Sequence, residues 1–225
     1  MKAILFGATG MVGQGVLRAC LLDPEVEAVL AVGRGPTGQT HAKLRELVHA
    51  DFTDFSSVEA RLAGYDACFF CLGVSSAGMS EADYRRVTLD FTLAAARPLA
   101  RLNPGMTFIY VSGSGTDSTE KGRTMWARVK GATENALQAL PFKAAYMFRP
   151  GYIQPLDGIK SKTRLYRALY VIARPLYAIG KHLAPKSAIT TADVGRAMID
   201  AAAHGAPKKH LENRDIKELS AKRPA

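Results

Sequence analysis

The feature that most constrains this chain is a glycine-rich turn near its start. An apolar run over residues 3–6, typical of a buried strand, leads into Gly7-Ala8-Thr9-Gly10-Met11-Val12-Gly13, and a helical pattern then runs to about Leu22. Glycines at these three positions permit a tight turn, a close approach of backbone N–H groups to a pyrophosphate, and packing of the helix on the strand. The positive end of the helix dipole faces the same place. The segment Gly7–Gly13 therefore predicts a dinucleotide site.

The remaining chain continues this alternation of strands and helices. Further strands are expected at 27–33, 47–50, 67–73, 106–112 and 142–150, and further helices at 79–100, 125–140 and 188–203. The tail, 208–220, predicts a short edge strand followed by a helical turn. Strand–helix alternation of this kind builds βαβ units with right-handed crossovers. The predicted fold class is α/β, with a doubly wound parallel sheet in a single domain over 1–225.

Length and composition exclude several classes of protein. The chain has 225 residues, of which 48% are hydrophobic and 22% charged, as in ordinary globular proteins. No stretch of 18 apolar residues occurs, which argues against a transmembrane helix. The apolar run at the N-terminus is too short for a signal peptide, so a cytoplasmic location is expected. The three cysteines, Cys20, Cys68 and Cys71, are too few for a disulfide scaffold.

The net charge of +10 is concentrated in one segment. Residues 152–187 hold three prolines and most of the basic excess, and we expect them to form a small helical cap over the carboxyl edge of the sheet. A heptad-like apolar stripe runs through 161–183, with arginines on another face. Three interpretations stay open: packing over a substrate pocket, self-association, or peripheral binding to an anionic membrane. Nucleic acid is not an expected partner, because no recognition module accompanies the charge.

Several motifs together resemble one family. The turn has GATGxxG spacing with Arg18 five residues on, and Gly33-Arg34, Asp51-Phe52, Cys71-Leu72-Gly73, Ser112-Gly113 and Arg149-Pro150-Gly151 follow successive predicted strands. This arrangement resembles the extended and atypical short-chain dehydrogenase/reductases, which have a Rossmann fold and bind NAD(P). The tail Leu211-Glu212-Asn213 with Ile216 and Leu219 resembles the Tat-interacting-protein-like branch of oxidoreductases.

The residues after the second strand favour NADP over NAD as the cofactor. NAD binders usually carry Asp or Glu there for the ribose 2′-OH, whereas this chain has Gly33-Arg34. A guanidinium suits a 2′-phosphate and can stack on adenine. The resemblance further implies that Asp51 and Phe52 edge the adenine. It implies that Cys71, Leu72 and Gly73 line the adenosine ribose, and that Pro150 and Gly151 lie near the nicotinamide.

The resemblance also implies a catalytic Tyr-x-x-x-Lys pair and a serine, and here the pattern breaks. The lysine matches Lys130 and the serine Ser112, or Ser114, but Trp126 stands in the tyrosine position. An indole N–H cannot act as a general acid in the working pH range. The catalytic candidates are therefore Ser112, Lys130, which also holds the nicotinamide ribose in the family, and Tyr152 or water as a substitute proton source.

Two hypotheses of function follow from this substitution. The first is an NADP(H)-dependent oxidoreductase acting on a small-molecule substrate, a carbonyl or unsaturated compound. The second is a non-catalytic NADP(H)-binding redox sensor or interaction protein. Trp126 itself could wall a substrate pocket or simply pack in the core.

Metal and thiol chemistry are not expected. Cys68 and Cys71 form a CxxC within a predicted strand, where positions three apart point to opposite faces, so we expect buried, inert thiols. The five histidines show no metal-ligand spacing. The sequence therefore predicts no metal site.

Overall fold

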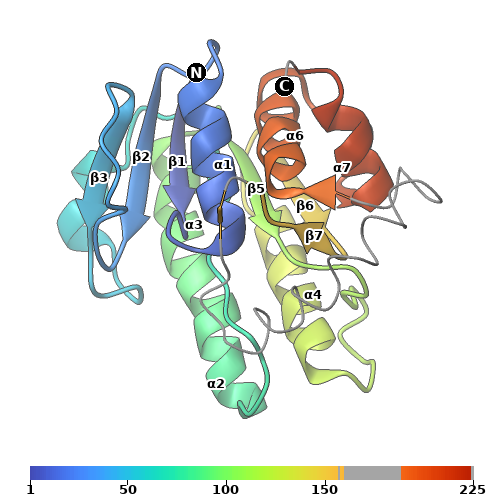
Figure 1. Ribbon diagram of the computed structural model, residues 1–225. Coiled ribbons are helices and arrows are strands. Elements are labelled where there is room, and N and C mark those ends of the chain that lie inside the picture. The colour runs from blue at the N-terminus through green and yellow to red at the C-terminus, as the bar shows by residue number, and fades with distance from the viewer. Residues whose placement is uncertain (157, 160–188, 224–225) are drawn as a thin grey trace.

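The computed structural model describes residues 1–156, 158–159 and 189–223 (Figure 1). Its main sheet has the strand order β3-β2-β1-β4-β5-β6-β9, and every neighbouring pair is parallel. The strands are β1 (Lys2–Phe6), β2 (Ala28–Gly33), β3 (Leu44–Val48), β4 (Ala67–Phe70), β5 (Thr107–Val111), β6 (Ala144–Arg149) and β9 (His210–Glu212). The predicted doubly wound parallel sheet is confirmed.

Helices cover both faces of this sheet (Figure 1). On one face lie α1 (Met11–Leu22), α6 (Thr191–His204) and α7 (Asn213–Ser220). On the other lie α3 (Phe91–Leu102) and α4 (Met125–Gln138). Within β1, Leu5 packs in the cluster under α1, whereas Ile4 and Phe6 pack in the opposite cluster. Burial of alternate side chains on two covered faces explains why these strands are apolar throughout.

The order of the strands creates a crevice beside β1. From β1 the chain moves outward through β2 to β3, and then crosses to β4 on the other side of β1. The connections that follow β1 and β4 therefore diverge at the carboxyl edge of the sheet. In open α/β sheets ligands bind at this switch point. The loops after β1, β2, β3, β4, β5 and β6 all meet this edge, and they carry most of the predicted site residues.

Several element boundaries differ from those predicted. The third strand is Leu44–Val48, not 47–50, because Leu44 and Leu47 are its buried residues. The helix predicted over 79–100 has three parts: α2 (Glu81–Arg85), the π-helical turn η2 (Arg86–Asp90), and α3. A short 3₁₀ helix, η1 (Ser56–Arg61), precedes β4.

The C-terminal part follows its prediction. Thr190 caps α6 through a capping box with Asp193. The tail adds β9 to the sheet edge beside β6, and α7 follows directly. Both the edge strand and the helical turn expected over 208–220 are thus present.

The predicted basic cap over 152–187 lies mostly outside the described residues, as does its stripe over 161–183. At the described ends of this segment, β7 (Ile153–Gln154) pairs in parallel with β8 (Ile189–Thr190). Among the residues that the structure describes, no helix has the length and apolar character needed to cross a membrane.

Candidate nucleotide-binding site

The loop between β1 and α1 is built on contacts that only glycine permits. Gly7 has a φ of +79°, and a Cβ there would lie 2.7 Å from the backbone of Cys71. At Gly13 a Cβ would lie 2.0 Å from the carbonyl oxygen of Gly7. The N–H of Gly10 donates to the same oxygen at 2.9 Å and closes the turn. The predicted glycine roles therefore match the local geometry of β1, α1 and the end of β4.

The beginning of α1 offers its backbone donors to this loop. The N-cap residue is Gly10, which provides no side-chain cap, and the first turn holds no acidic residue. The first N–H groups of a helix lack partners within the helix and carry partial positive charge. Such an end suits a phosphate. The backbone cradle and these donors together fit the pyrophosphate of a dinucleotide.

A cavity of about 260 Å³ adjoins the loop. It is lined by Gly7, Ala8, Thr9, Ala31, Val32, Gly33, Arg34, Gly35, Pro36, Thr37, Phe52 and Leu72. Six residues of the predicted cofactor set thus meet around one cavity: Gly7, Ala8, Thr9, Arg34, Phe52 and Leu72. Asp51 is not among the lining residues. Its exposed carboxylate accepts hydrogen bonds from Thr53 instead, which lower the pKa of Asp51.

The electrostatics of the cavity come from the loop after β2. Among the described residues that line it, Arg34 is the one with a charged side chain. The neighbouring Thr37 is fixed by Glu46 of β3, whose carboxylate accepts from the Thr37 N–H at 2.6 Å and from its hydroxyl at 2.5 Å. The loop that presents Arg34 is therefore anchored to the adjacent strand.

On the other side of the crevice, Lys130 of α4 reaches the end of β5. Its ammonium donates to the backbone carbonyl of Ser112 and lies 5.9 Å from the centre of the Tyr110 ring. Burial lowers the pKa of Lys130 to about 8, and the nearby carboxylate of Glu134 partly opposes this effect. The structure thus places the predicted lysine at the predicted strand end.

The side chains of Ser112 and Trp126 are arranged differently from a serine–tyrosine pair. The hydroxyl of Ser112 is buried and donates to Glu134 at 2.5 Å, and the Phe148 carbonyl oxygen lies 3.1 Å from it. The half-buried Trp126 ring lies over the turn that follows Ser112 and contains Gly113 and Gly115, since a Cβ at Gly115 would be 3.7 Å from the ring. A catalytic role for Ser112 stays a prediction, and the bond to Glu134 does not favour it.

The loop after β6 is held from two directions. The carbonyl of Pro150 accepts from the Ser114 N–H at 2.9 Å, and the Gly151 N–H donates to the side chain of Asn213 at 2.8 Å. Asn213 begins α7 and belongs to the tail motif noted in the sequence. That motif therefore holds the loop of Pro150 and Gly151, which is predicted to lie near the nicotinamide. The hydroxyl of Tyr152 donates to Gln154 at 2.8 Å. The role of Tyr152 as a proton source likewise stays a prediction.

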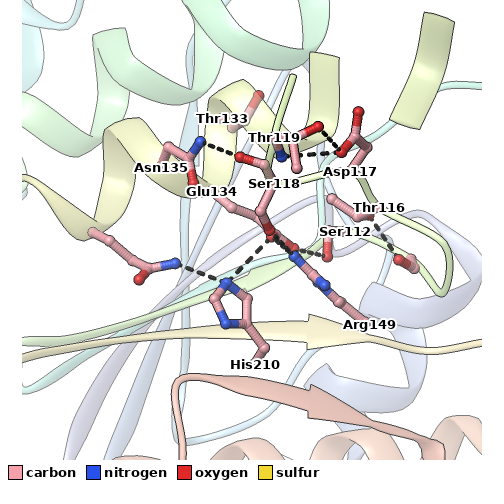
Figure 2. A network of polar contacts seen from close by, with 12 residues as sticks. Ser112, Thr116, Asp117, Ser118, Thr119, Thr133, Glu134, Asn135, Arg149 and His210 are labelled. Atoms are coloured by element: carbon pink, nitrogen blue, oxygen red, sulfur yellow. Dashed lines mark hydrogen bonds and ion pairs between the residues drawn. The ribbon is translucent and has the colours of Figure 1, made fainter. Parts of the chain in front are cut away.

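A buried polar network behind these loops was not predicted (Figure 2). Glu134 is 0% exposed and forms an ion pair with Arg149, and it also accepts from Ser112. The guanidinium of Arg149 donates to Ser118 as well. One signal in the sequence could have indicated this site: Glu134 follows Lys130 by four residues and so shares its helical face.

Among the residues that the structure describes, the thiols belong to no cluster of side chains that could hold a metal ion. Cys68 packs in the cluster under α3 and α4, whereas Cys71 packs against the opposite cluster. Burial raises the pKa of Cys20, Cys68 and Cys71, so all three are poor nucleophiles at neutral pH. Cys68 and Cys71 lie on opposite faces of the sheet as predicted, with Cys68 buried and Cys71 half-buried.

Comparison with known proteins agrees with this geometry. The family model described as NAD(P)H-binding matches residues 7–151, from the first glycine of the turn to the loop after β6. The chain belongs to this NAD(P)H-binding family. The match bears out the resemblance to the atypical short-chain dehydrogenase/reductases and the prediction of an NAD(P) site.

Full-length relatives and solved structures extend the comparison. The mitochondrial protein fmp52-2 of Aspergillus oryzae is 26% identical over 224 residues, 96% of each chain. The mitochondrial protein FMP52-1 of Scheffersomyces stipitis is 24% identical over 231 residues, 97% of this chain and 98% of its own. The Bordetella bronchiseptica enzyme WbmF in complex with NAD+ has a TM-score of 0.65 at 16% identity, over 98% of this chain and 76% of its own. A short-chain dehydrogenase/reductase-family oxidoreductase from Burkholderia thailandensis has a TM-score of 0.67 at 16% identity, over 94% and 90%.

These relatives overturn one prediction. The cytoplasmic location expected from the sequence is wrong by this comparison, because the Fmp52 relatives are named mitochondrial proteins. The prediction rested on the lack of a long apolar segment at the N-terminus. That criterion detects secretory leaders and carries no information about mitochondrial import, for which the known signals are amphipathic and rich in arginine.

The low pKa of Lys130 can be measured directly. We expect its ammonium to titrate near pH 8, whereas exposed lysines titrate near 10.4. Between these values the unfolded chain binds more protons than the folded one, so Lys130 makes the free energy of unfolding rise with pH over this window. NMR of ¹³C-dimethylated lysines should show one early titration that Lys130→Arg removes. Titration of every lysine above pH 10 would contradict the structure.

Proposed function

We propose that this protein is an NADP(H)-binding oxidoreductase that acts on a small carbonyl or unsaturated compound. The observation that carries the proposal is the position of Arg34 in the cavity beside the glycine loop. A carboxylate at this place would accept from a ribose 2′-OH and repel a 2′-phosphate. The guanidinium has the opposite preference, because it forms paired, charge-assisted hydrogen bonds with phosphate.

The adenosine half of the nucleotide would occupy the cavity after β2. The apolar walls from Phe52 and Leu72 suit the adenine and ribose, and Arg34 suits the 2′-phosphate. The pyrophosphate would lie against Gly7–Gly13 and the first turn of α1, where the backbone leaves no room for a Cβ. The nucleotide would then continue across the carboxyl edge of the sheet, along the other residues predicted to contact it: Cys71, Gly73, Pro150 and Gly151.

The nicotinamide half would lie between the loops after β5 and β6. Lys130 would bind the nicotinamide ribose, a role that does not require a neighbouring tyrosine. When bound, the nicotinamide supplies hydride chemistry. Trp126 would form an apolar wall for a planar substrate beside Gly115. Water or Tyr152 would supply the proton, because Trp126 cannot and Ser112 already donates to Glu134.

A second candidate is an NADP(H)-binding protein without turnover. The specific observation in its favour is that neither member of the expected serine–tyrosine pair is available: Trp126 does not titrate, and the Ser112 hydroxyl is turned away into a buried network. A sensor or interaction protein would keep the nucleotide site and lose only the proton donor. The two candidates differ in turnover and share the binding site.

The cofactor preference gives the first test. Arg34→Ala should weaken NADPH binding by about tenfold to a hundredfold, as expected for losing a charge-assisted bond, and should change NADH binding much less. Calorimetry with both coenzymes measures this. Arg45→Ala is the matched control, because Arg45 is exposed on the adjacent strand, outside the cavity lining. Equal losses for both coenzymes in Arg34→Ala would refute the assignment.

The proton donor gives the second test. Trp126→Tyr restores the Tyr-x-x-x-Lys spacing beside Lys130, and a positioned general acid contributes about 10²–10⁴-fold to rate. We expect slow NADPH oxidation by the wild type over a panel of aldehydes, quinones and enones, and a rise of about 10²-fold in Trp126→Tyr. Trp126→Phe, which has no hydroxyl, should show no such rise. A folded Trp126→Tyr variant that binds NADPH without any turnover would favour the binding protein.

A further inference from the structure

Glu134 of α4 lies within the polar network of Figure 2 and is fully buried. It follows Lys130 by one turn of the helix. Its carboxylate accepts from Arg149 Nε at 3.0 Å and from Ser112 Oγ at 2.5 Å, and a second guanidinium nitrogen completes the ion pair. The His210 ring nitrogen Nε2 lies 3.5 Å from the same carboxylate. Withdrawing a charge from water is costly, and partners of this kind must replace the lost solvation. The packing of α4 on the sheet does not by itself explain the buried carboxylate of Glu134.

Ser112 connects this carboxylate to Lys130. The Ser112 hydroxyl donates to Glu134, and its backbone carbonyl accepts from the Lys130 ammonium. Glu134 therefore holds Ser112, and Ser112 in turn holds the ammonium of Lys130. Lys130 and Glu134 also lie four residues apart on one face of α4, so their charges interact along the helix as well.

Arg149 extends the same connection to the surrounding loops. Its guanidinium donates to Ser118, in the loop between β5 and α4. The next residue, Pro150, accepts through its carbonyl from the Ser114 N–H at 2.9 Å. One ion pair thus joins the carboxyl ends of β5 and β6 to the loop that passes beside Trp126.

We propose that Glu134 is a positioning residue, which acts through Ser112 and Arg149 to hold the Lys130 ammonium in place at the nucleotide site. Glu134 touches neither nucleotide nor substrate in this account. The inference rests on the proposed function, because Lys130 is the proposed ligand of the nicotinamide ribose. It deepens that function by naming what keeps the lysine cationic and oriented without the family's tyrosine beside it.

The electrostatics of the pair support this role. Burial lowers the pKa of Lys130, and the charge of Glu134 raises it in opposition. Among the described residues, other titratable or charged groups around the pair come from four elements: Tyr84 of α2, Tyr110 of β5, Arg149 of β6, and His210 and Glu212 of β9. Neutralising Glu134 removes the carboxylate charge that raises the pKa of Lys130 and so moves the titration of the ammonium to lower pH.

The test compares Glu134→Gln with the wild type in two measurements. The first is the Lys130 titration by NMR in the nucleotide-free protein, where we expect a midpoint clearly below the wild-type value of about 8. The second is NADPH affinity from pH 6 to 9. We expect binding about threefold to tenfold weaker at pH 7, the effect of one ordinary hydrogen bond, with the alkaline loss of affinity also shifted downward. Glu81→Gln is the matched control, because Glu81 of α2 forms an ion pair with Arg128 of α4, the helix that carries Glu134.

A second variant guards against simple unfolding. Glu134→Gln leaves the Arg149 charge without its partner, so the double variant Glu134→Leu, Arg149→Met removes both charges from the buried site. We expect it to fold and to show the same downward shift of the Lys130 titration. A folded variant, single or double, whose Lys130 titrates as in the wild type would overturn the proposal.

The two measurements separate this inference from the proposed function. If the wild type fails to bind NADPH, the proposed function is wrong, and the Lys130 titration still decides whether Glu134 positions the lysine. If NADPH binds to the wild type and the titration does not move in Glu134→Gln, the site stands and the positioning role is refuted.

Discussion

The contact between the carbonyl of Gly7 and the first turn of α1 sets the architecture of this molecule. A Cβ at Gly13 would lie 2.0 Å from that carbonyl, and a Cβ at Gly7 would meet the backbone of Cys71. Three segments, the end of β1, the start of α1 and the end of β4, therefore approach more closely than any side chain allows. This approach leaves backbone donors at the switch point of the sheet and gives an anionic ligand a place to bind. Arg34 adds a positive charge at this place, and we propose that this charge selects among such ligands.

A second constraint operates behind the loops of the other half. The ion pair between Glu134 and Arg149 is shielded from water, and it joins α4 to the ends of β5 and β6. Through Ser112 it reaches Lys130, whose pKa burial lowers to about 8. In the proposed function, Lys130 binds the nucleotide while Trp126 stands in the position of the group that would move a proton. Nucleotide binding and proton transfer, which the family usually combines, would then depend on different residues.

The sequence predicted the parts of the fold that depend on local patterns. The glycine turn, the parallel sheet and the edge strand with its following helix over 208–220 were all recognised, because spacing and periodicity specify them. The third strand was placed too late, since two polar residues, Arg45 and Glu46, separate its buried residues Leu44 and Leu47 at an edge of the sheet. The π-helical turn over 86–90 has no sequence signal that separates it from an α-helix. Glu134 was missed because its burial follows from a partner 15 residues away, on another element.

We propose that the β1–α1 loop and Arg34 form a site that prefers the phosphorylated coenzyme. Isothermal titration calorimetry of the folded protein with NADPH and with NADH measures this preference. We expect a saturable, one-site isotherm for NADPH and binding at least tenfold weaker for NADH, a difference of about 1.4 kcal/mol. Absence of binding to both coenzymes at millimolar concentration, or tighter binding of NADH, would contradict it.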